Sequence, residues 1–360
     1  MLGARVPINL DEYEALARER SPKMVFNYYA GGANDELTVA ENKSAWGRIR
    51  LRPRVLVDVS RIDTSTTVLG QTLKMPVLTA PCAFNTLAHP EGECAVARAT
   101  AATGIIQVVS TAATKSFEEI SGASGGRRWF QLYCYRDRGV TRGLVQAAEA
   151  AGFSALCLTV DVPVLGRRER EIRDRFQLPP GVTMVNLEPF AADRLAATDN
   201  PSSLAAYVND LWDSSLTWEV IGWLRSITKM PVVVKGILTA EDARLALERG
   251  VAAIVVSNHG GRQLDGAVPT CEALPEVVEA VGGRVEVLVD GGIRRGADVV
   301  KALALGARAV LIGRPYLWGL AVNGEEGVRH VLELLRDEIQ LAMALVGRPA
   351  VKDIDRTLVA

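Results

Sequence analysis

One histidine stands in a segment that suits neither a helix nor a strand. His259 lies in SNHGGRQLD (residues 257–265), where two glycines follow it, and Asp161 ends an apolar run upstream. A carboxylate that faces an imidazole can hold it in one tautomer, so that the imidazole acts as a general base. The sequence therefore predicts proton transfer by His259 and Asp161. A metal site is less favoured, because neither His89 nor His330 comes at a ligand spacing from it.

Three cations near these residues indicate an anionic ligand. Arg168 follows Asp161 in LGRRER, and Arg262 follows His259. Two guanidinium groups suit bidentate binding of a carboxylate, whereas the neighbouring Arg167, Glu169 and Arg170 are more simply a solvated charged face. Lys235 ends the apolar run VVVK, where a cation would stabilise negative charge on a bound ring or enolate.

Two glycine turns late in the chain are candidates for a phosphate site. DGGIRRG (residues 290–296) and IGRP (312–315) each follow an apolar run and precede a helical pattern. Glycines let backbone N–H groups approach an anion, and a helix N-terminus and arginines add positive potential. Ordinary loop chemistry would explain either turn alone, but the two together favour a phosphorylated ligand.

The elements that must position these residues are eight short β-branched runs separated by helical patterns. The runs are apolar throughout, as is typical of parallel strands covered on both faces. Eight strand–helix units over about 240 residues predict an α/β fold, a (β/α)8 TIM barrel with its site at the carboxyl ends of the strands. A doubly wound open sheet is the alternative. The expected strands are residues 75–80, 104–110, 128–133, 155–161, 231–235, 253–257, 285–290 and 309–313.

Helices are expected between these strands and before the first of them. The segment 239–250 opens with Thr239 as N-cap and ends on Gly250, and 139–152 and 294–306 follow the same pattern. Residues 1–74, with a helix at 10–20, form an N-terminal extension that caps the barrel or folds over it. Residues 75–350 form the barrel, with a long lid-like insertion at 162–217 after the fourth strand, and 351–360 a tail.

Composition excludes several classes of protein. The 360 residues carry 41 basic and 42 acidic side chains, a net charge of −1, so no nucleic-acid or membrane partner is expected. No apolar run is long enough to span a bilayer, and the N-terminus does not resemble a signal peptide. Five cysteines without a CxxC pair indicate reduced thiols and a cytoplasmic location.

Nine blocks of sequence together carry a family resemblance. In order they are YYAGGANDE, RPR, HPEGE, FQLY, LTVDVPVLGRRE, VVKGI, SNHGGRQLD, DGGIRRG and LIGRP. From about residue 10 to about residue 354 the chain resembles the FMN-dependent L-2-hydroxy acid oxidases and dehydrogenases, such as glycolate oxidase and lactate oxidase. The resemblance implies FMN as cofactor, a 2-hydroxy acid and O2 as small-molecule partners, and a homotetramer or homo-octamer. Trp212, Trp218 and Trp223 fit exposure at such an interface only loosely.

The resemblance also implies a role for each site residue. His259 takes a proton from the substrate hydroxyl, or from the α-carbon in a carbanion mechanism, and Asp161 stabilises the imidazolium. Arg168 and Arg262 bind the carboxylate. Tyr28 and Tyr133 donate hydrogen bonds to the substrate, and Lys235 favours the anionic reduced flavin. The residues implied to hold FMN are Pro81, Cys82, Ala83, Ser110, Gln131, Thr159, Lys235, Ser257, Asp290, Gly291, Gly292, Ile293, Arg294, Gly313 and Arg314.

One position departs from the glycolate oxidase pattern. Ala112, in STAATKS, stands where glycolate oxidases resemble one another in a bulky tryptophan. A small residue there should open the substrate pocket, although Phe84 could refill part of it. We therefore expect lactate or a larger 2-hydroxy acid to be preferred over glycolate.

Three other functions remain as alternatives. A dehydrogenase would pass electrons to a quinone or cytochrome in place of O2, and the absence of a fused haem domain favours the oxidase only mildly. A phosphosugar isomerase or lyase would use the phosphate site for its substrate. A barrel that serves only as a scaffold would be expected to lose the imidazole, the two guanidinium groups or the tyrosines, all of which are present.

Overall fold

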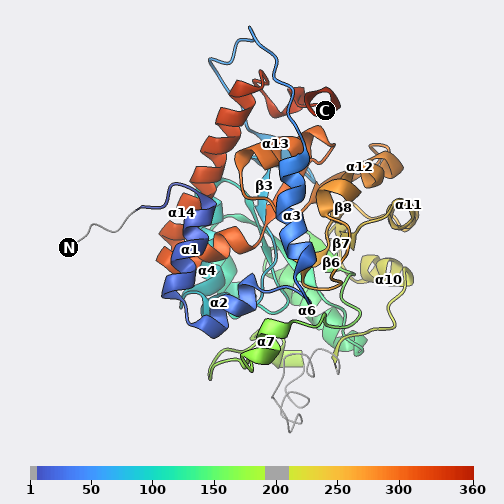
Figure 1. The fold of residues 1–360 in the computed structure, drawn as a ribbon. Helices are drawn as coiled ribbons and strands as arrows, with labels where there is room; N and C mark the ends of the chain where they lie inside the picture. The colour runs from blue at the N-terminus through green and yellow to red at the C-terminus, as the bar shows by residue number, and fades with distance from the viewer. Residues whose placement is uncertain (1–5, 191–210) are drawn as a thin grey trace, which may run out of the picture.

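The eight predicted strands close into one parallel barrel. The computed structural model describes residues 6–190 and 211–360, and its strand order is β10-β3-β4-β5-β6-β7-β8-β9. Strand β10 pairs with β3 through Val310 and Val77, which closes the sheet. Figure 1 shows the labelled strands β3, β6, β7 and β8 with helices around them. The predicted (β/α)8 barrel is confirmed, and the open doubly wound sheet is wrong. The strands are β3 Val77–Thr79, β4 Ile106–Val109, β5 Arg127–Leu132, β6 Leu156–Thr159, β7 Val232–Ile237, β8 Ala253–Val256, β9 Glu286–Val289 and β10 Ala309–Ile312.

Helices follow the strands and cover the outside of the barrel. The expected N-cap is present in α11, where the Thr239 hydroxyl accepts a hydrogen bond from the Asp242 N–H at 3.2 Å. The chain then turns at Gly250, whose φ of +72° is rarely adopted by residues that carry a side chain. The outer helices are α4 Gly92–Thr103, α5 Phe117–Ala123, α6 Arg138–Ala150, α10 Glu219–Ile227, α11 Ala240–Glu248, α12 Thr270–Val281, α13 Gly296–Ala304 and α14 Arg314–Leu345.

A small hairpin closes the amino end of the barrel. Its strands β1 (Thr66–Val68) and β2 (Gln71–Leu73) contribute Val68 and Leu73 to the apolar cluster that fills the barrel interior. The Leu69 N–H also donates to Glu286, the first residue of β9. The site therefore has to form at the opposite, carboxyl end of the strands.

The rest of the N-terminal segment reaches that carboxyl end. Helix α1 (Leu10–Arg20) packs against α14, and α2 (Lys23–Ala30) leads to α3 (Leu37–Arg48), which contacts the turn His259–Gly261. Between α2 and α3, the Ala33 N–H donates to the Gly261 carbonyl at 2.9 Å. Residues 6–74 thus contact both ends of the barrel. Within residues 6–190 and 211–360, no helix has the length and apolar character that crossing a membrane requires.

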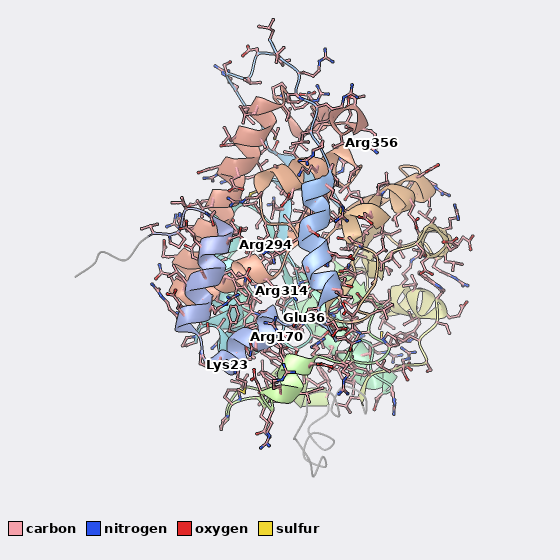
Figure 2. All side chains as sticks on the ribbon, viewed as in Figure 1. Lys23, Glu36, Arg170, Arg294, Arg314 and Arg356 are labelled. Atoms are coloured by element: carbon pink, nitrogen blue, oxygen red, sulfur yellow. The ribbon has the colours of Figure 1, made fainter. Side chains whose placement is uncertain are left out.

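The insertion after β6 begins with a short helix that is tied to the N-terminal segment. In α7 (Glu169–Arg173), Arg170 forms an ion pair with Glu36, and Figure 2 labels the two residues close to each other. Arg170 therefore does not simply face solvent, as the charged run suggested. The Asn27 amide donates to Asp174 at 2.6 Å. The expected lid extends over residues 191–210, which lie outside the described residues.

Candidate active site

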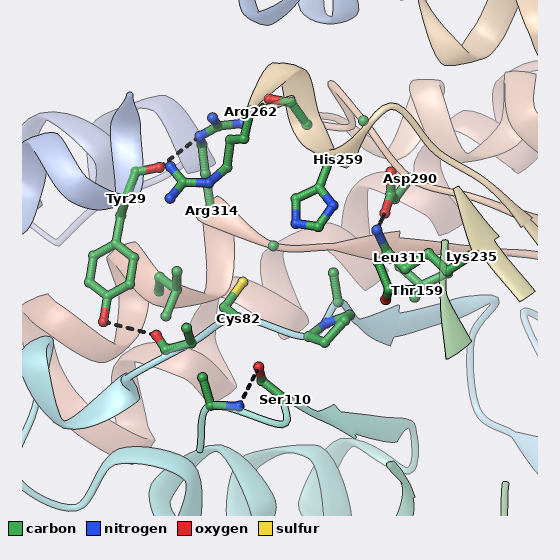
Figure 3. Close-up of a pocket in the computed structure, with 18 of the residues that line it drawn as sticks. Tyr29, Cys82, Ser110, Thr159, Lys235, His259, Arg262, Asp290, Leu311 and Arg314 are labelled. Carbon is green, nitrogen blue, oxygen red and sulfur yellow. Dashed lines mark hydrogen bonds and ion pairs between the residues drawn. The ribbon is translucent and has the colours of Figure 1, made fainter. Parts of the chain in front are cut away.

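A cavity opens at the carboxyl ends of the barrel strands. Its volume is about 1200 Å³, its open mouth included, and its walls come from the ends of the strands and from the loops that follow them (Figure 3). Of the predicted site residues, those that line it are Tyr28, Pro81, Cys82, Ala83, Ser110, Ala112, Tyr133, Thr159, Arg168, Lys235, His259, Arg262, Asp290, Gly291, Gly292, Ile293, Arg294, Gly313 and Arg314.

Three further predicted residues lie behind that wall and contact it. The Asp161 carboxylate binds His259, the Gln131 side chain accepts a hydrogen bond from the Ser110 hydroxyl at 3.3 Å, and Ser257 accepts one from Lys235. The sequence therefore identified residues that the fold brings to one place.

His259 is held with one ring nitrogen toward the cavity. Its φ of +57°, within the glycine-rich turn, is unusual for a side-chain residue, and Nδ1 lies 2.8 Å from Asp161 Oδ1. With Nδ1–H donating to the carboxylate, Nε2 keeps its lone pair and lies 3.4 Å from the Tyr133 hydroxyl. Burial lowers the pKa of His259 below 6.5, and the Asp161 charge only partly offsets this. The imidazole is therefore neutral at pH 7 and able to accept a proton.

The tyrosine beside it stays protonated. Burial raises the pKa of Tyr133, and the Asp161 charge adds to this effect. The Tyr133 ring stacks on Trp212 with centroids 3.9 Å apart, which fixes the hydroxyl near the histidine. The Tyr133 hydroxyl can therefore donate a hydrogen bond to a ligand atom that lies within reach of His259 Nε2, the nitrogen that can accept a proton.

Two arginines lie at the mouth around a shared carboxylate. Glu171 Oε1 is 3.5 Å from Arg168 Nη1 and 3.2 Å from Arg262 Nη2. Arg262 is also fixed by hydrogen bonds to the carbonyls of Tyr28 and Gly31, and its guanidinium lies 5.2 Å from the centre of the Tyr28 ring. Both guanidinium groups are thus oriented before a ligand arrives, as the binding of a carboxylate requires.

Lys235 lies deep in the cavity between two acids. Its ammonium group is 3.1 Å from Asp290 Oδ2 and 2.9 Å from the Ser257 hydroxyl (Figure 3). Burial alone would lower the pKa of Lys235, but the charges of Asp290 and Asp161 outweigh it and the pKa rises. A permanent positive charge is therefore fixed next to the space where a ring could bind.

The last two βα turns form an arginine-rich end of the cavity. Arg314 donates hydrogen bonds to the carbonyls of Tyr29, Gly31 and Gly260, and Figure 2 shows it near Arg294. Burial and the charges of Arg262 and Arg294 lower the pKa of Arg314 to about 9. This cluster of positive charge is suited to an anion.

Glycine is required in the turn that carries Arg294. Gly292 has a φ of +79°, and a Cβ there would lie 1.9 Å from the Asn42 carbonyl oxygen. The backbone can follow this path only without a side chain.

The structure also identifies site residues that the sequence reasoning missed. Glu171 and Leu165 come from the insertion after β6, Met184 and Trp212 from further along it. Glu171 had a signal, because it follows Arg168 at a helical i, i+3 spacing. Met184 had none. Trp212, which the sequence offered as an exposed aromatic, lines the cavity and is only partly exposed.

The fold and the site together define a class of enzyme. A closed parallel barrel with an arginine-rich anion site after its last two strands, and a histidine–carboxylate pair facing two arginines, is typical of a barrel enzyme that binds a phosphorylated ligand and transfers a proton. The family model described as "FMN-dependent dehydrogenase" matches residues 17–360. The chain belongs to this family, and its cofactor is FMN.

Curated relatives and solved structures agree with this assignment. The chain is 54% identical to "L-lactate oxidase" from Nostoc sp. (strain PCC 7120 / SAG 25.82 / UTEX 2576), covering 97% of both chains. It is 54% identical to "Glycolate oxidase 3" from Arabidopsis thaliana, covering 97% of this chain and 95% of the relative. Among solved structures, mandelate oxidase with (S)-4-hydroxymandelic acid is 44% identical, with a TM-score of 0.92 and 98% of each chain covered.

The residues around the cavity fit FMN. The buried polar atoms without a hydrogen-bond partner within residues 6–190 and 211–360 include Thr159 Oγ1, Gln131 Nε2, Asp290 Oδ1 and Arg294 Nε, which all belong to predicted cofactor residues. Buried groups of this kind are costly unless something pairs with them. They extend from the depth of the cavity to the arginine-rich end. A ligand with a polar ring edge, a hydroxylated chain and a phosphate supplies the missing partners, and FMN has all three parts.

Proposed function

We propose that the protein oxidises an L-2-hydroxy acid, lactate or a larger one, to the 2-oxo acid. In this reaction R–CH(OH)–COO⁻ and O2 give R–CO–COO⁻ and H2O2. The observation that carries the proposal is His259 Nε2, which faces the cavity beside Tyr133 while Asp161 holds the other ring nitrogen. The named relatives, an L-lactate oxidase and a glycolate oxidase, support the same reaction type.

The substrate carboxylate is bound by the two arginines at the mouth. Arg168 and Arg262 already point to one acceptor, the Glu171 oxygen, so a second carboxylate can bind in the same region by bidentate hydrogen bonds. This contact places the α-carbon and its hydroxyl deeper in the cavity, toward His259. Specific orientation of this kind lowers the entropic part of the barrier.

His259 takes the hydroxyl proton and Asp161 stabilises the imidazolium that forms. A neutral buried imidazole is a suitable base at pH 7, and the carboxylate at 2.8 Å favours its protonated form as the reaction proceeds. Tyr133 donates a hydrogen bond to the same substrate oxygen. FMN, held by the residues described above, would supply the acceptor for the two electrons and the hydrogen of the α-carbon. Lys235 holds a fixed positive charge that stabilises an anion next to it.

The wall of the cavity supports a substrate with a side chain. Ala112 presents only a methyl group, and Phe84 and Met184 add further apolar surface to the cavity. A tryptophan in place of Ala112 would occupy the space that a lactate methyl group or a larger substituent needs. We therefore favour lactate or a larger 2-hydroxy acid over glycolate.

A visible spectrum tests the reaction directly. Purified protein should be yellow, and anaerobic addition of L-lactate should bleach the flavin band, whereas D-lactate should not. A colourless protein would favour a phosphosugar enzyme, and a yellow protein that no 2-hydroxy acid bleaches would overturn the proposal.

The electron acceptor needs a separate measurement. Stopped-flow mixing of the reduced enzyme with O2 should restore the oxidised spectrum rapidly and yield one H2O2 per 2-oxo acid. Slow reoxidation by O2 with fast reoxidation by a quinone would instead identify a dehydrogenase. A cytoplasmic location and a homotetramer or homo-octamer also remain predictions, and light scattering on the purified protein tests the oligomeric state.

A further inference from the structure

A fully buried acid links the two loops that form the substrate wall. Glu93 ends the block HPEGE and lies in the first turn of α4, with 2% of its surface exposed. The mechanism proposed above does not use it, and it forms no salt bridge within the described residues. A carboxylate in such a place needs hydrogen-bond donors from its surroundings.

Its partners come from two different loops. Oε1 accepts hydrogen bonds from the backbone N–H groups of Asn85 and Thr114, both at 3.1 Å, and Oε2 accepts one from the Thr114 hydroxyl at 2.8 Å. The Thr86 N–H donates to that hydroxyl at 3.3 Å. Asn85 and Thr86 follow β3, whereas Thr114 follows β4. One side chain thus joins the loops after two neighbouring strands.

Each of these two loops also carries one residue of the cavity wall, just before the residue that Glu93 contacts. Phe84 precedes Asn85, Ala112 lies two residues before Thr114, and the Phe84 N–H donates to the Ala112 carbonyl at 3.0 Å. Phe84 has a φ of +55°, a backbone conformation that an aromatic residue rarely adopts. The surrounding structure therefore has to hold Phe84 in this conformation. The Tyr29 hydroxyl donates a hydrogen bond to the Phe84 carbonyl at 2.7 Å, and Glu93 binds the N–H of the next residue, Asn85.

We propose that Glu93 is a positioning residue that fixes the spacing between Phe84 and Ala112, and so sets how tightly the substrate side chain is held. This inference rests on the proposed oxidation of a 2-hydroxy acid. It predicts that removing the hydrogen bonds of Glu93 raises KM most for a substrate whose side chain contacts the wall formed by Phe84 and Ala112. L-lactate has a methyl group that can contact the wall, and glycolate has only hydrogen at that position.

Three variants separate positioning from simple stabilisation. Glu93→Leu removes all the acceptors at similar volume. Thr114→Val removes the hydroxyl that both Glu93 and Thr86 contact, and carries the test if Glu93→Leu does not fold. Glu93→Gln is the conservative rescue, because its amide oxygen can accept from both N–H groups while its NH2 donates to the Thr114 hydroxyl. Glu91→Gln, in the same block but paired with Arg98 on the surface, is the control.

The readout is the Michaelis constant for each substrate, with FMN content and thermal unfolding measured in parallel. We expect KM for L-lactate to rise at least about fivefold in Glu93→Leu and Thr114→Val, while KM for glycolate changes less than about twofold. Glu93→Gln and Glu91→Gln should keep both values within about twofold of those of the unmodified protein. Equal changes for the two substrates, or lower stability with unchanged KM values, would overturn the inference. An unmodified protein whose flavin no L-2-hydroxy acid bleaches would reject the proposed function itself, and the inference with it.

Discussion

The Asp161 carboxylate holds His259 through only one of its oxygens. Oδ1 lies 2.8 Å from His259 Nδ1, and Oδ2 has no hydrogen-bond partner within residues 6–190 and 211–360. The ring is thereby oriented with Nε2 toward the cavity. Because the second oxygen is left without a donor, the carboxylate keeps much of its negative charge available to the imidazolium that forms during proton transfer.

Replacing the histidine should abolish flavin reduction but not flavin binding. His259→Asn removes the base while it keeps a smaller polar side chain, so we expect retained FMN and a rate of flavin reduction by L-lactate about 10²–10⁴-fold lower. Anaerobic stopped-flow spectroscopy measures this rate. The control is His330→Asn on α14, where the imidazole contacts Tyr13 and does not line the cavity. Substantial reduction in His259→Asn would show that another group takes the proton.

Removing the charge of Asp161 should change both the rate and its pH dependence. The base must be neutral, so kcat/KM falls as pH drops through the pKa of His259, which burial places below 6.5. The Asp161 charge raises that pKa; without it the pKa falls further. In Asp161→Asn the decrease of kcat/KM at acid pH (the acid limb of the pH profile) should therefore move to lower pH. The pH-independent value of kcat/KM should drop at least about tenfold, because the imidazolium loses its partner.

A profile of kcat/KM between pH 4 and pH 9 measures both effects. Asp242→Asn on the outer helix α11 is the matched control and should leave the limb in place. A limb that moves to higher pH in Asp161→Asn would contradict the assigned contact.

The sequence predicted the barrel and most of the site because both follow from local patterns. Parallel strands buried on both faces appear as apolar runs, and the carboxyl ends of such strands meet at one rim. Lys235 and Asp290 each end or follow one run, so the fold class places both at the same rim, but their ion pair at 3.1 Å was not predicted. His259 was found because only one histidine lies in a glycine-rich turn.

The remaining contacts depend on how the long insertion packs back over the mouth. Trp212 reaches Tyr133 from 79 positions further along the chain, and no local periodicity reports such a contact. Met184 lines the cavity for the same reason. The role of Glu93 also required the structure, because its donors lie on two loops that only the closed barrel brings together.

The arginine-rich end should bind the phosphate of FMN. Arg294 Nε is buried without a partner in the described residues, and a charge-assisted hydrogen bond contributes about 1.5–3 kcal/mol. Arg294→Ala should therefore weaken FMN binding about 10- to 100-fold, measured by fluorescence titration of the apoprotein. Riboflavin, which has no phosphate, should bind both proteins equally. Arg295→Ala, which removes a surface pair with Glu338, is the control. Equal losses for FMN and riboflavin would contradict a phosphate contact.

The carboxylate between the two arginines should oppose substrate binding. Glu171 places a negative charge where the substrate carboxylate has to bind, and Glu171→Gln keeps an acceptor oxygen for both guanidinium groups without that charge. We expect KM for L-lactate to fall about three- to tenfold, and inhibition by the 2-oxo acid product to tighten by a similar factor. Glu169→Gln, whose exposed carboxylate pairs with Arg167, should change neither. A higher KM in Glu171→Gln would mean that its charge mainly orients the arginines.

A tryptophan at position 112 should shift the preference toward glycolate. Ala112 lines the cavity, and its carbonyl accepts a hydrogen bond from the Phe84 N–H. A larger side chain at position 112 therefore projects into space that a substrate substituent would otherwise occupy. Ala112→Trp should therefore lower kcat/KM for L-lactate relative to glycolate by at least about tenfold, since one methyl-sized contact can change discrimination by that factor. Ala112→Ser adds only a hydroxyl and should leave the ratio nearly unchanged. If the tryptophan variant binds FMN normally and keeps the ratio of the unmodified protein, Ala112 does not determine substrate size, and Phe84 and the insertion residues Met184 and Trp212 are the next candidates.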